Sequence, residues 1–384
     1  MLKFPKIILP LKGVNYLIFI VLVNSIASSM LVPIFPLYIK NFVSNNAVVG
    51  YISVFIAALL ILYTLLTMKL LPRIKKMTLI KVGFLGLAIT QIIFTVLVNI
   101  EQFLILEIVR ALFLVATYLT MGLFVREYTS TKAMGRAEGQ YFTIANLGFL
   151  LGPLLGGLLA NAYSFNVVFI VSAIPQILIA ALLFLIPLKE SETQHKHKLG
   201  ILDYFKNKSL LMLYLLALGL FAWWSILYTY LPLYANTSGF SAKIIGYALF
   251  AAAIPLILLE IPIGKLADSH GFRKYIALGF IIIGLVMLLT YFAKPFYVLI
   301  LIAAATIGAA FIEPLLEAYF FKNVKTKEDE HKLYPVYKTS AHLSSLIAPL
   351  IFSTILIYFN FKGLFLFVAI LMLIFSLLAL KLKK

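Results

Sequence analysis

The sequence predicts an all-α membrane protein with twelve transmembrane helices, arranged as two six-helix pseudo-repeats with both termini in the cytoplasm. Three observations lead to this prediction. Hydrophobic residues make up 63% of the 384 residues and charged residues only 12%, whereas about a quarter of the residues in soluble domains are charged. Segments rich and poor in Lys and Arg alternate along the chain, and landmarks of the first half recur at one fixed spacing in the second half.

Twelve apolar segments are long enough to cross a bilayer, which takes about 20 apolar residues in a helix. To within a few residues at each end, they are predicted at 14–38, 48–71, 77–98, 102–125, 137–162, 166–187, 209–235, 243–266, 275–293, 296–320, 334–358 and 363–380. Lys3, Lys6 and Lys12 precede the first segment, and no small-residue cleavage site follows it. We therefore interpret it as a retained span rather than a removed signal.

The distribution of basic residues predicts the orientation. With both termini inside, each cytoplasmic segment carries three to five Lys or Arg residues, and each of four outer loops carries one: Lys40, Lys243, Lys294 and Lys362. Such a bias sets the orientation of membrane proteins. The net charge of +18 is thus a topology signal and an attraction to anionic lipid, not a sign of nucleic-acid binding. We expect a multi-pass protein of the plasma (inner) membrane that acts as a monomer.

A polar stretch divides the chain into an N-terminal six-helix bundle (1–187), a cytoplasmic linker (188–208) and a C-terminal six-helix bundle (209–384). Pro36-Leu37-Tyr38 recurs 196 positions later as Pro232-Leu233-Tyr234, and Pro153 recurs as Pro349. Parallel repeats of this kind place a substrate site near the membrane midplane, between halves that rock against each other. The alternative is an ancient duplication in a membrane protein that transports nothing.

The sequence also argues against enzymatic function. It has no cysteine, which excludes disulfides and thiolate metal sites. It contains no phosphate-binding P-loop, no dinucleotide-binding fingerprint and no nucleophile elbow. We expect neither a cofactor nor a bound metal.

The loop at residues 264–274 reads GKLADSHGFRK. Its motif residues are Gly264, Asp268, Gly271, Arg273 and Lys274. The glycines permit a tight turn, and the Arg can pair with the Asp. The loop resembles the loop motif of the major facilitator superfamily, which implies a gate that closes the cytoplasmic side when the outside is open. The corresponding first-half loop, 66–77, keeps only the basic end of the motif.

The predicted fifth span contains NLGFLLGPLLGGLLA at residues 146–160. Its motif residues are Gly148, Gly152, Pro153, Gly156 and Gly157. The segment resembles the fifth-span signature of the twelve-span drug:proton antiporter branch of that superfamily, and Arg110 resembles the arginine of the fourth-span motif. The resemblance implies the major facilitator fold. Small residues four apart also serve general helix packing in lipid, which is the alternative interpretation.

Five charged residues lie inside predicted spans: Glu107, Arg110, Glu260, Glu313 and Glu317. Each costs at least about 2.5 kcal/mol at the bilayer centre, so each is a functional candidate. Glu107 and Arg110 are three residues apart and can pair on one helix face, either as a structural ion pair or as a switchable one that couples charge to cavity opening. Glu260 lies near the cytoplasmic end of span eight and is interpreted as interfacial or gate-related.

Glu313 is the strongest candidate for proton coupling. It lies eight residues, or about 12 Å, from the cytoplasmic end of span ten, close to the midplane. Glu317 follows one turn later, and two such carboxylates in a poorly hydrated setting are not expected to be ionised together. Pro314 bends the helix between them. We predict that Glu313 carries the proton while Glu317 modulates it or simply pairs with a cytoplasmic lysine such as Lys322.

The resemblance implies that spans one, four, seven and ten line the substrate cavity. Candidate cavity residues on spans one and seven are Asn24, Ser28, Trp223, Trp224 and Tyr228. Aromatic walls with a few acids suit a lipophilic or cationic substrate.

The sequence therefore predicts a secondary active transporter that moves a small molecule by alternating access. Proton-coupled export of lipophilic or cationic compounds is the first hypothesis, with the proton as coupling ion. The alternatives are a proton symporter or uniporter for a nutrient or metabolite, including an anionic one held by Arg110, and a non-transporting membrane sensor.

Overall fold

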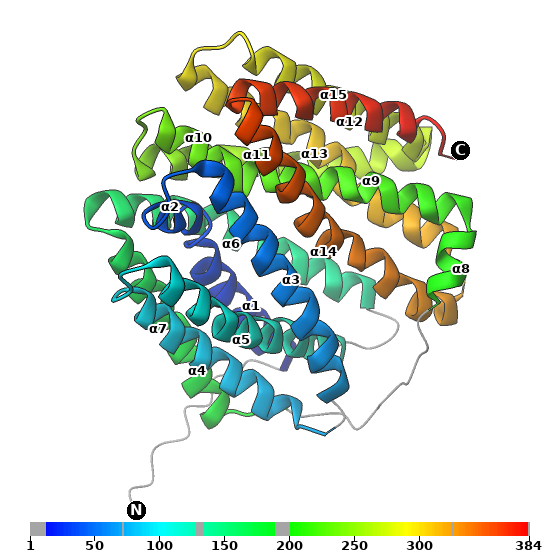
Figure 1. The fold of residues 1–384 in the computed structure, drawn as a ribbon. Helices are drawn as coiled ribbons and strands as arrows, with labels where there is room; N and C mark the ends of the chain where they lie inside the picture. Colours follow the sequence, from blue (N-terminus) through cyan, green and yellow to red (C-terminus); the bar gives the residue numbers. More distant parts are fainter. Residues whose placement is uncertain (1–12, 71–72, 128–133, 189–199, 325, 383–384) are drawn as a thin grey trace, which may run out of the picture.

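The computed structural model describes residues 13–70, 73–127, 134–188, 200–324 and 326–382, and these fold into helices joined by short connections (Figure 1). In chain order the helices are α1 (Gly13–Ser29), α2 (Phe35–Lys40), α3 (Asn46–Leu70), α4 (Lys76–Phe94), α5 (Ile100–Glu127), α6 (Met134–Ala162), α7 (Phe165–Leu185), α8 (Ile201–Lys206), α9 (Lys208–Ser225), η1 (Ile226–Tyr230), α10 (Leu231–Thr237), α11 (Ala242–His270), α12 (Phe272–Thr290), α13 (Pro295–Asn323), α14 (Lys327–Tyr358) and α15 (Phe361–Ala379). The short helix α8 lies within the predicted linker, whose residues 189–199 are outside the described part, as are Lys3, Lys6 and Lys12.

Among the described residues, ten helices are long and apolar enough to cross a membrane. Two shorter apolar helices, Tyr16–Ser29 and Asn146–Ala162, lie where the first and fifth spans are predicted. Large apolar side chains such as Leu258, Ile261 and Leu377 point outward and are more than 60% exposed. A bilayer gives these side chains an apolar environment, which is why the helices are apolar on all sides.

The repeat seen in the sequence is also present in the helix boundaries. The helices α2, α3, α4 and α7 begin 196 residues before α10, α11, α12 and α15, as Phe35 and Leu231 illustrate. Even the N-caps correspond, because Ser164 of α7 and Asn360 of α15 each accept hydrogen bonds from backbone N–H groups of the first turn. The two halves therefore share one helical plan.

The first long helix of each half is interrupted at equivalent positions. Residues 30–34 form turns between α1 and α2, and the equivalent residues 226–230 form the π-helix η1 between α9 and α10. Pro36 and Pro232 follow these interruptions and have no N–H to donate to the preceding turn. A regular α-helical hydrogen-bond ladder cannot continue there, and such π-turns are frequent at functional sites.

The two halves touch through α3 with α14, α6 with α11, and α2 with α10. A Cβ built on Gly157 of α6 would lie 2.5 Å from the carbonyl oxygen of Ala242 and 2.9 Å from the Cα of Gly246. A Cβ built on Gly50 of α3 would lie 1.8 Å from Ser353 Oγ of α14. Gly50 and Gly246 are equivalent in the repeat, as are Gly157 and Ser353, so the two contacts are related by pseudo-twofold symmetry.

Hydrogen bonds join the halves at the same end of the bundle. Lys40 Nζ and Asn46 Nδ2 donate to Thr237 Oγ1 at 2.9 and 3.1 Å. The hydroxyls of Tyr51 and Thr354 are 3.0 Å apart. We call the end that contains these five residues the closed end, and the opposite end, where α8 lies, the linker end.

The buried apolar residues follow the same division. The largest cluster consists of side chains from α8 to the C-terminus together with Leu37 of α2. A first-half cluster includes Leu233 of α10. Leu37 and Leu233 are equivalent in the repeat, so α2 and α10 each insert one leucine into the core of the opposite half. This reciprocal exchange ties the halves together at the closed end.

Candidate transport site

Glu313 lies within the long apolar helix α13, where the tenth span is predicted. The helix extends to Asn323, ten residues beyond Glu313, which corresponds to about 15 Å. Pro314 lies inside the same helix, and the Glu313 side chain is partly exposed. Among the described residues, Glu313 makes no hydrogen bond or ion pair. It is therefore a carboxylate available to a proton or to a cation.

Glu317, one turn closer to the linker end, is paired. Lys338 of α14 places its Nζ 2.8 Å from Glu317 Oε1, and the hydroxyl of Tyr334 donates a hydrogen bond to the same oxygen. Lys322, which the sequence offered as a partner, instead lies 5.1 Å over the ring of Phe272. An ion pair at Glu317 was thus anticipated, but its cation comes from a different helix.

The helix packing adds a third carboxylate that the sequence did not connect with this site. The helices α11 and α13 pack against each other, and the charges of Glu260, Glu317 and Lys338 all act on Glu313. Glu260 was interpreted as an interfacial or gate residue. The structure groups it electrostatically with Glu313, in a cluster of three carboxylates and one lysine.

Two aromatic side chains, one at the end of α9 and one in η1, stack on each other. The rings of Trp224 and Tyr228 are stacked, with centroids 5.7 Å apart and planes at 18°. The ring of Tyr228 also approaches that of Phe149 on α6 of the other half, with centroids 6.0 Å apart. In addition, Tyr228 lies within electrostatic range of Glu313. Both Trp224 and Tyr228 are partly exposed, as residues that contact a substrate must be.

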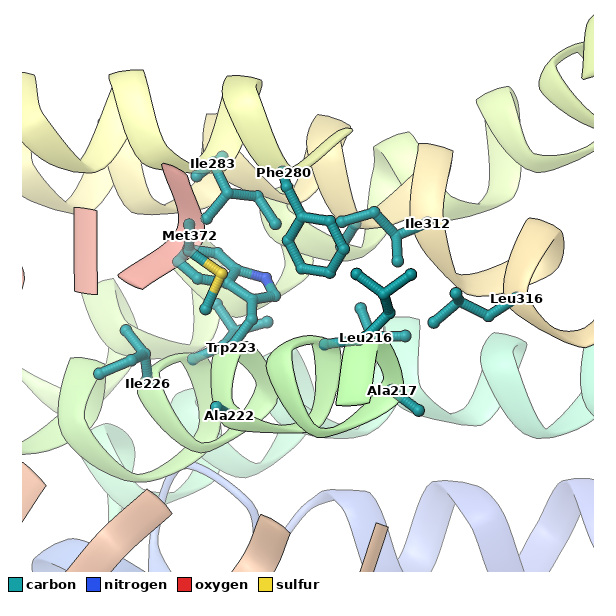
Figure 2. Packing of buried hydrophobic residues seen from close by; sticks show 14 of the residues in the cluster. Leu216, Ala217, Ala222, Trp223, Ile226, Phe280, Ile283, Ile312, Leu316 and Met372 are labelled. Atoms are coloured by element: carbon teal, nitrogen blue, oxygen red, sulfur yellow. The ribbon is translucent and has the colours of Figure 1, made fainter. Parts of the chain in front are cut away.

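The prediction that Trp223 lines the cavity is wrong. Its side chain is fully buried in the core of the second half, among Phe280, Ile283, Ile312 and Met372 (Figure 2). Adjacent residues of a helix point about 100° apart, so Trp224 can face the interior of the transporter while Trp223 faces the helices α12, α13 and α15.

The first-half candidates Asn24 and Ser28 lie together on α1. Ser28 Oγ donates to Asn24 Oδ1 at 3.4 Å, and both side chains are partly exposed. Their neighbours Ser25 and Ser29 pack against α6 instead, where Ser29 Oγ donates to the carbonyl oxygen of Gly148 at 2.7 Å. The two faces of α1 therefore have different surroundings, and Asn24 and Ser28 share the face that is not used for this packing.

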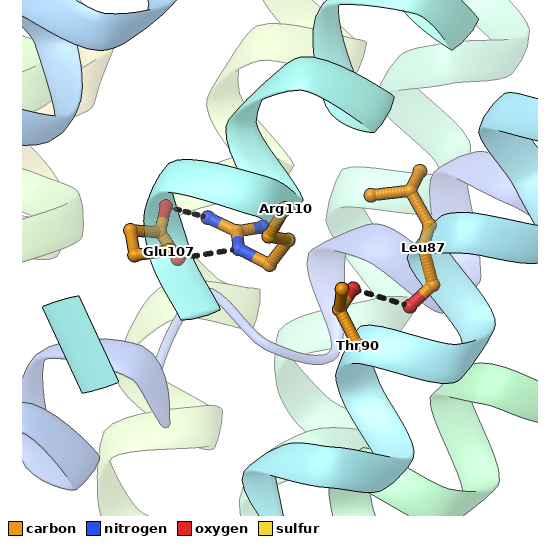
Figure 3. Close-up of polar contacts among 4 residues, drawn as sticks. All are labelled: Leu87, Thr90, Glu107 and Arg110. Atoms are coloured by element: carbon orange, nitrogen blue, oxygen red, sulfur yellow. Dashed lines mark hydrogen bonds and ion pairs between the residues drawn. The ribbon is translucent and has the colours of Figure 1, made fainter. Parts of the chain in front are cut away.

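Glu107 and Arg110 form the ion pair that their spacing predicts. Arg110 donates through Nε and Nη2 to the two carboxylate oxygens of Glu107, each at 2.6 Å (Figure 3). Glu107 is fully buried and Arg110 is 11% exposed. The Arg110 guanidinium also lies 4.7 Å over the ring of Phe35, which begins α2. The pair thus connects α5 with the aromatic residues near the closed end.

The fifth-span glycines are packing positions. A Cβ built on Gly148, Gly152 or Gly156 would lie 2.4 Å or less from atoms of residues 25–30, so these three glycines seat α6 on the first helix. Gly157 faces the opposite half, and the carbonyl oxygen of Pro153 approaches Gly246 of α11. One motif therefore packs α6 within its own half and against the other half.

The loop motif lies at the linker end, where α11 ends and α12 begins. Gly271 has a φ of +92°, which favours glycine, and it ends α11. The expected ion pair between Asp268 and Arg273 is not formed, and neither residue has a hydrogen-bond or ion-pair partner among the described residues. A Cβ built on Gly264 would meet nothing within 4 Å, and Lys274 is exposed.

Known proteins show the same fold. A POT family transporter, solved in complex with 5-aminolevulinic acid, superposes with a TM-score of 0.79 at 13% identity over 97% of each chain. The nucleoside transporter NupG has a TM-score of 0.77 at 11% identity, over 97% of this chain and all of that one. At such identities the likeness concerns the fold alone.

Two multidrug resistance proteins are similar to this chain in sequence. Multidrug resistance protein MdtG of Salmonella choleraesuis is 24% identical over 358 residues, which cover 88% of this chain and 87% of that protein. Multidrug resistance protein 1 of Bacillus subtilis is 22% identical over 308 residues, 76% of this chain and 77% of that protein. Residues 17–257 and 239–384 match the Major Facilitator Superfamily. The chain therefore belongs to the Major Facilitator Superfamily, and it is a secondary transporter.

Proposed function

We propose that the protein is a proton-coupled exporter of lipophilic or cationic compounds. The observation that carries this proposal is that the Glu313 carboxylate has no hydrogen-bond or ion-pair partner among the described residues and lies within electrostatic range of Tyr228. Either a proton on Glu313 or a cation held against Trp224 and Tyr228 would neutralise the carboxylate. Because the two compete for one negative charge, export of a cation would be coupled to entry of a proton. Similarity to two multidrug resistance proteins supports a drug-like cargo.

The two acids of α13 have different roles in this scheme. Glu313 carries the proton, since none of the described residues balances its charge by a direct contact. Glu317 is held by Lys338 and Tyr334, so it modulates Glu313 through its charge rather than exchanging a proton in every cycle. Glu260 adds a further negative charge that favours a cation over an anion at Glu313.

The orientation predicted from the basic residues assigns the closed end to the outside of the cell. The described conformation would then accept cargo from the cytoplasm and release it after the halves rock to open the closed end. The missing ion pair between Asp268 and Arg273 supports this assignment, because a cytoplasmic latch would be released in such a conformation.

Glu107 and Arg110 couple charge to this movement. The bidentate pair holds Arg110 against Phe35 of α2, and α2 contacts α10 of the other half. A proton on Glu107 would free the guanidinium and loosen this connection. The alternative of an anionic cargo bound to Arg110 is less favoured, since the guanidinium is already engaged by a carboxylate and an aromatic ring.

The test uses purified protein in proteoliposomes with an imposed pH gradient and tetraphenylphosphonium as the cargo. Glu313→Gln should reduce gradient-driven transport to the level of empty liposomes, whereas Glu313→Asp and Glu317→Gln should retain part of it. If Glu313→Gln transports as fast as the unmodified protein, Glu313 does not carry the proton. Proton movement in the same direction as the cargo would instead indicate a symporter.

A further inference from the structure

At the linker end, the carboxylate of Glu317 and the rings of Tyr334 and Tyr337 surround the ammonium group of Lys338. We call these three side chains the cage. Lys338 Nζ is 2.8 Å from Glu317 Oε1, 5.0 Å from the centroid of the Tyr334 ring and 5.7 Å from that of Tyr337. A carboxylate combined with aromatic faces is the arrangement that recognises organic ammonium ions. We infer that the cage is a cargo-binding station for lipophilic cations, in which Lys338 is a tethered occupant that incoming cargo replaces. This inference rests on the proposed function.

The cage walls are also packed against one another and against neighbouring aromatic rings. Tyr334 donates its hydroxyl hydrogen to Glu317, which orients the carboxylate. Its ring stacks on Phe321, with centroids 5.4 Å apart, and the Tyr337 ring stacks on Phe320 at 5.3 Å. Walls that are already ordered bind a ligand without a further loss of conformational freedom.

The occupant, in contrast, can leave. The Lys338 side chain is 36% exposed, and its flexible four-carbon stem lets the ammonium swing away. Arg110 in the same chain is held more firmly, because its guanidinium donates two hydrogen bonds and its side chain is only 11% exposed. Glu317 is itself 28% exposed, so a cation arriving at the linker end can reach it.

The position and charge of the cage define the class of its ligand. It lies one helical turn from Glu313, on the side of the linker end, so a cation released from it is close to the proposed proton site. Among the described residues, the charges that act on Glu313 are those of two carboxylates, Glu260 and Glu317, and of one lysine, Lys338. Replacing that lysine by a cation with aromatic or aliphatic surface preserves the charge balance, whereas an anion would face three carboxylates.

The experiment measures equilibrium binding of tetraphenylphosphonium to the full chain in lipid nanodiscs, through quenching of its tryptophan fluorescence. Lys338→Met removes the tethered competitor, so it should bind the cation roughly tenfold more tightly, as loss of a competing cation–π contact implies. Lys338→Arg keeps a cation in the cage and should bind as the unmodified protein does. The neutral probe triphenylphosphine oxide should bind equally to all three proteins.

Two further variants make the result specific. Lys362→Met is the matched control, since Lys362 also lies over a tyrosine ring, 5.7 Å from the centroid of Tyr291, but is not among the charges that act on Glu313. It should leave binding unchanged. Adding Glu317→Gln to Lys338→Met should abolish the gain in affinity. Melting curves identify folded variants, and Lys338→Gln replaces Lys338→Met if the latter does not fold.

The outcomes separate the two proposals. If the unmodified protein binds the cation but Lys338→Met binds it no more tightly, the cage is not a cargo station and the proposed export function is unaffected. If neither protein binds the cation at any concentration below that which disrupts the nanodiscs, the proposed function fails and this inference fails with it.

Discussion

Substituting Gly157 with alanine tests whether the closed end is a gate. The added Cβ would lie 2.5 Å from the carbonyl oxygen of Ala242 and 2.9 Å from the Cα of Gly246. Both contacts are backbone atoms of α11, so no side-chain rotation can make room. Ordinary contact begins near 3.4 Å, and α6 and α11 must therefore separate by about 1 Å.

The added methyl group should shift the balance between the two conformations of the transporter, because the clash exists in only one of them. Overpacking a close contact costs about 1–3 kcal/mol, and here it destabilises only the conformation in which the closed end is shut. The helix propensity gained on replacing glycine is common to both conformations and cancels. At 1.4 kcal/mol per factor of ten, the ratio of proteins with an open closed end to proteins with a shut one should rise roughly 5- to 140-fold.

Spin-label distances report this ratio directly. The chain has no cysteine of its own, so Ser44→Cys and Asn236→Cys add two labelling sites at exposed residues of the closed end, one on each half. Gly157→Ala should increase the population at longer distances in double electron–electron resonance. Gly122→Ala on α5, where an added Cβ would meet nothing within 4 Å, is the control. A folded Gly157→Ala protein with the distance distribution of its parent would refute the gate.

Three further outcomes are expected. Trp223→Ala should lower the free energy of unfolding by about 3–5 kcal/mol, because it leaves a cavity in the core, and the melting temperature should fall. Trp224→Ala should have nearly the melting temperature of its parent but should lose cargo binding. Arg110→Ala leaves the buried Glu107 without its partner and should cost about 3–5 kcal/mol, which the double variant with Glu107→Gln should largely restore in melting experiments. Burial raises the pKa of the Tyr204 phenol on α8. Its folded-state pKa therefore lies above the unfolded value near 10, so stability is complete below about pH 10 and is lost as the pH rises further. Melting curves should show Tyr204→Phe losing less stability between pH 9 and 11 than its parent.

The features that sequence predicted well depend on residues close together in the chain. Glu107 and Arg110 are three apart on one helix, so their pairing follows from helical geometry alone. The positions of the apolar helices follow from the length that a bilayer requires. The repeat of 196 residues extends to helix boundaries because equivalent prolines and capping residues act locally.

The errors and omissions concern contacts between helices. Trp223 and Trp224 are neighbours in an apolar helix, and no polar face indicates which of them turns to the core. Glu317 pairs with Lys338, 21 positions away on another helix, rather than with Lys322 on its own. Glu260 and Glu313 are brought together only by the packing of α11 on α13.

The length of an apolar segment, the distribution of basic residues and the spacing of glycines are properties of short segments. The helices, their repeat and the position of Glu313 along its helix could therefore be inferred from the sequence alone. The rotation of each helix and the choice of its neighbours depend on the fit of many side chains at once. For that reason, only the tertiary structure revealed that Glu313 has no hydrogen-bond or ion-pair partner among the described residues and that Trp224, unlike Trp223, is partly exposed. It also revealed that Lys338 lies against Glu317, Tyr334 and Tyr337.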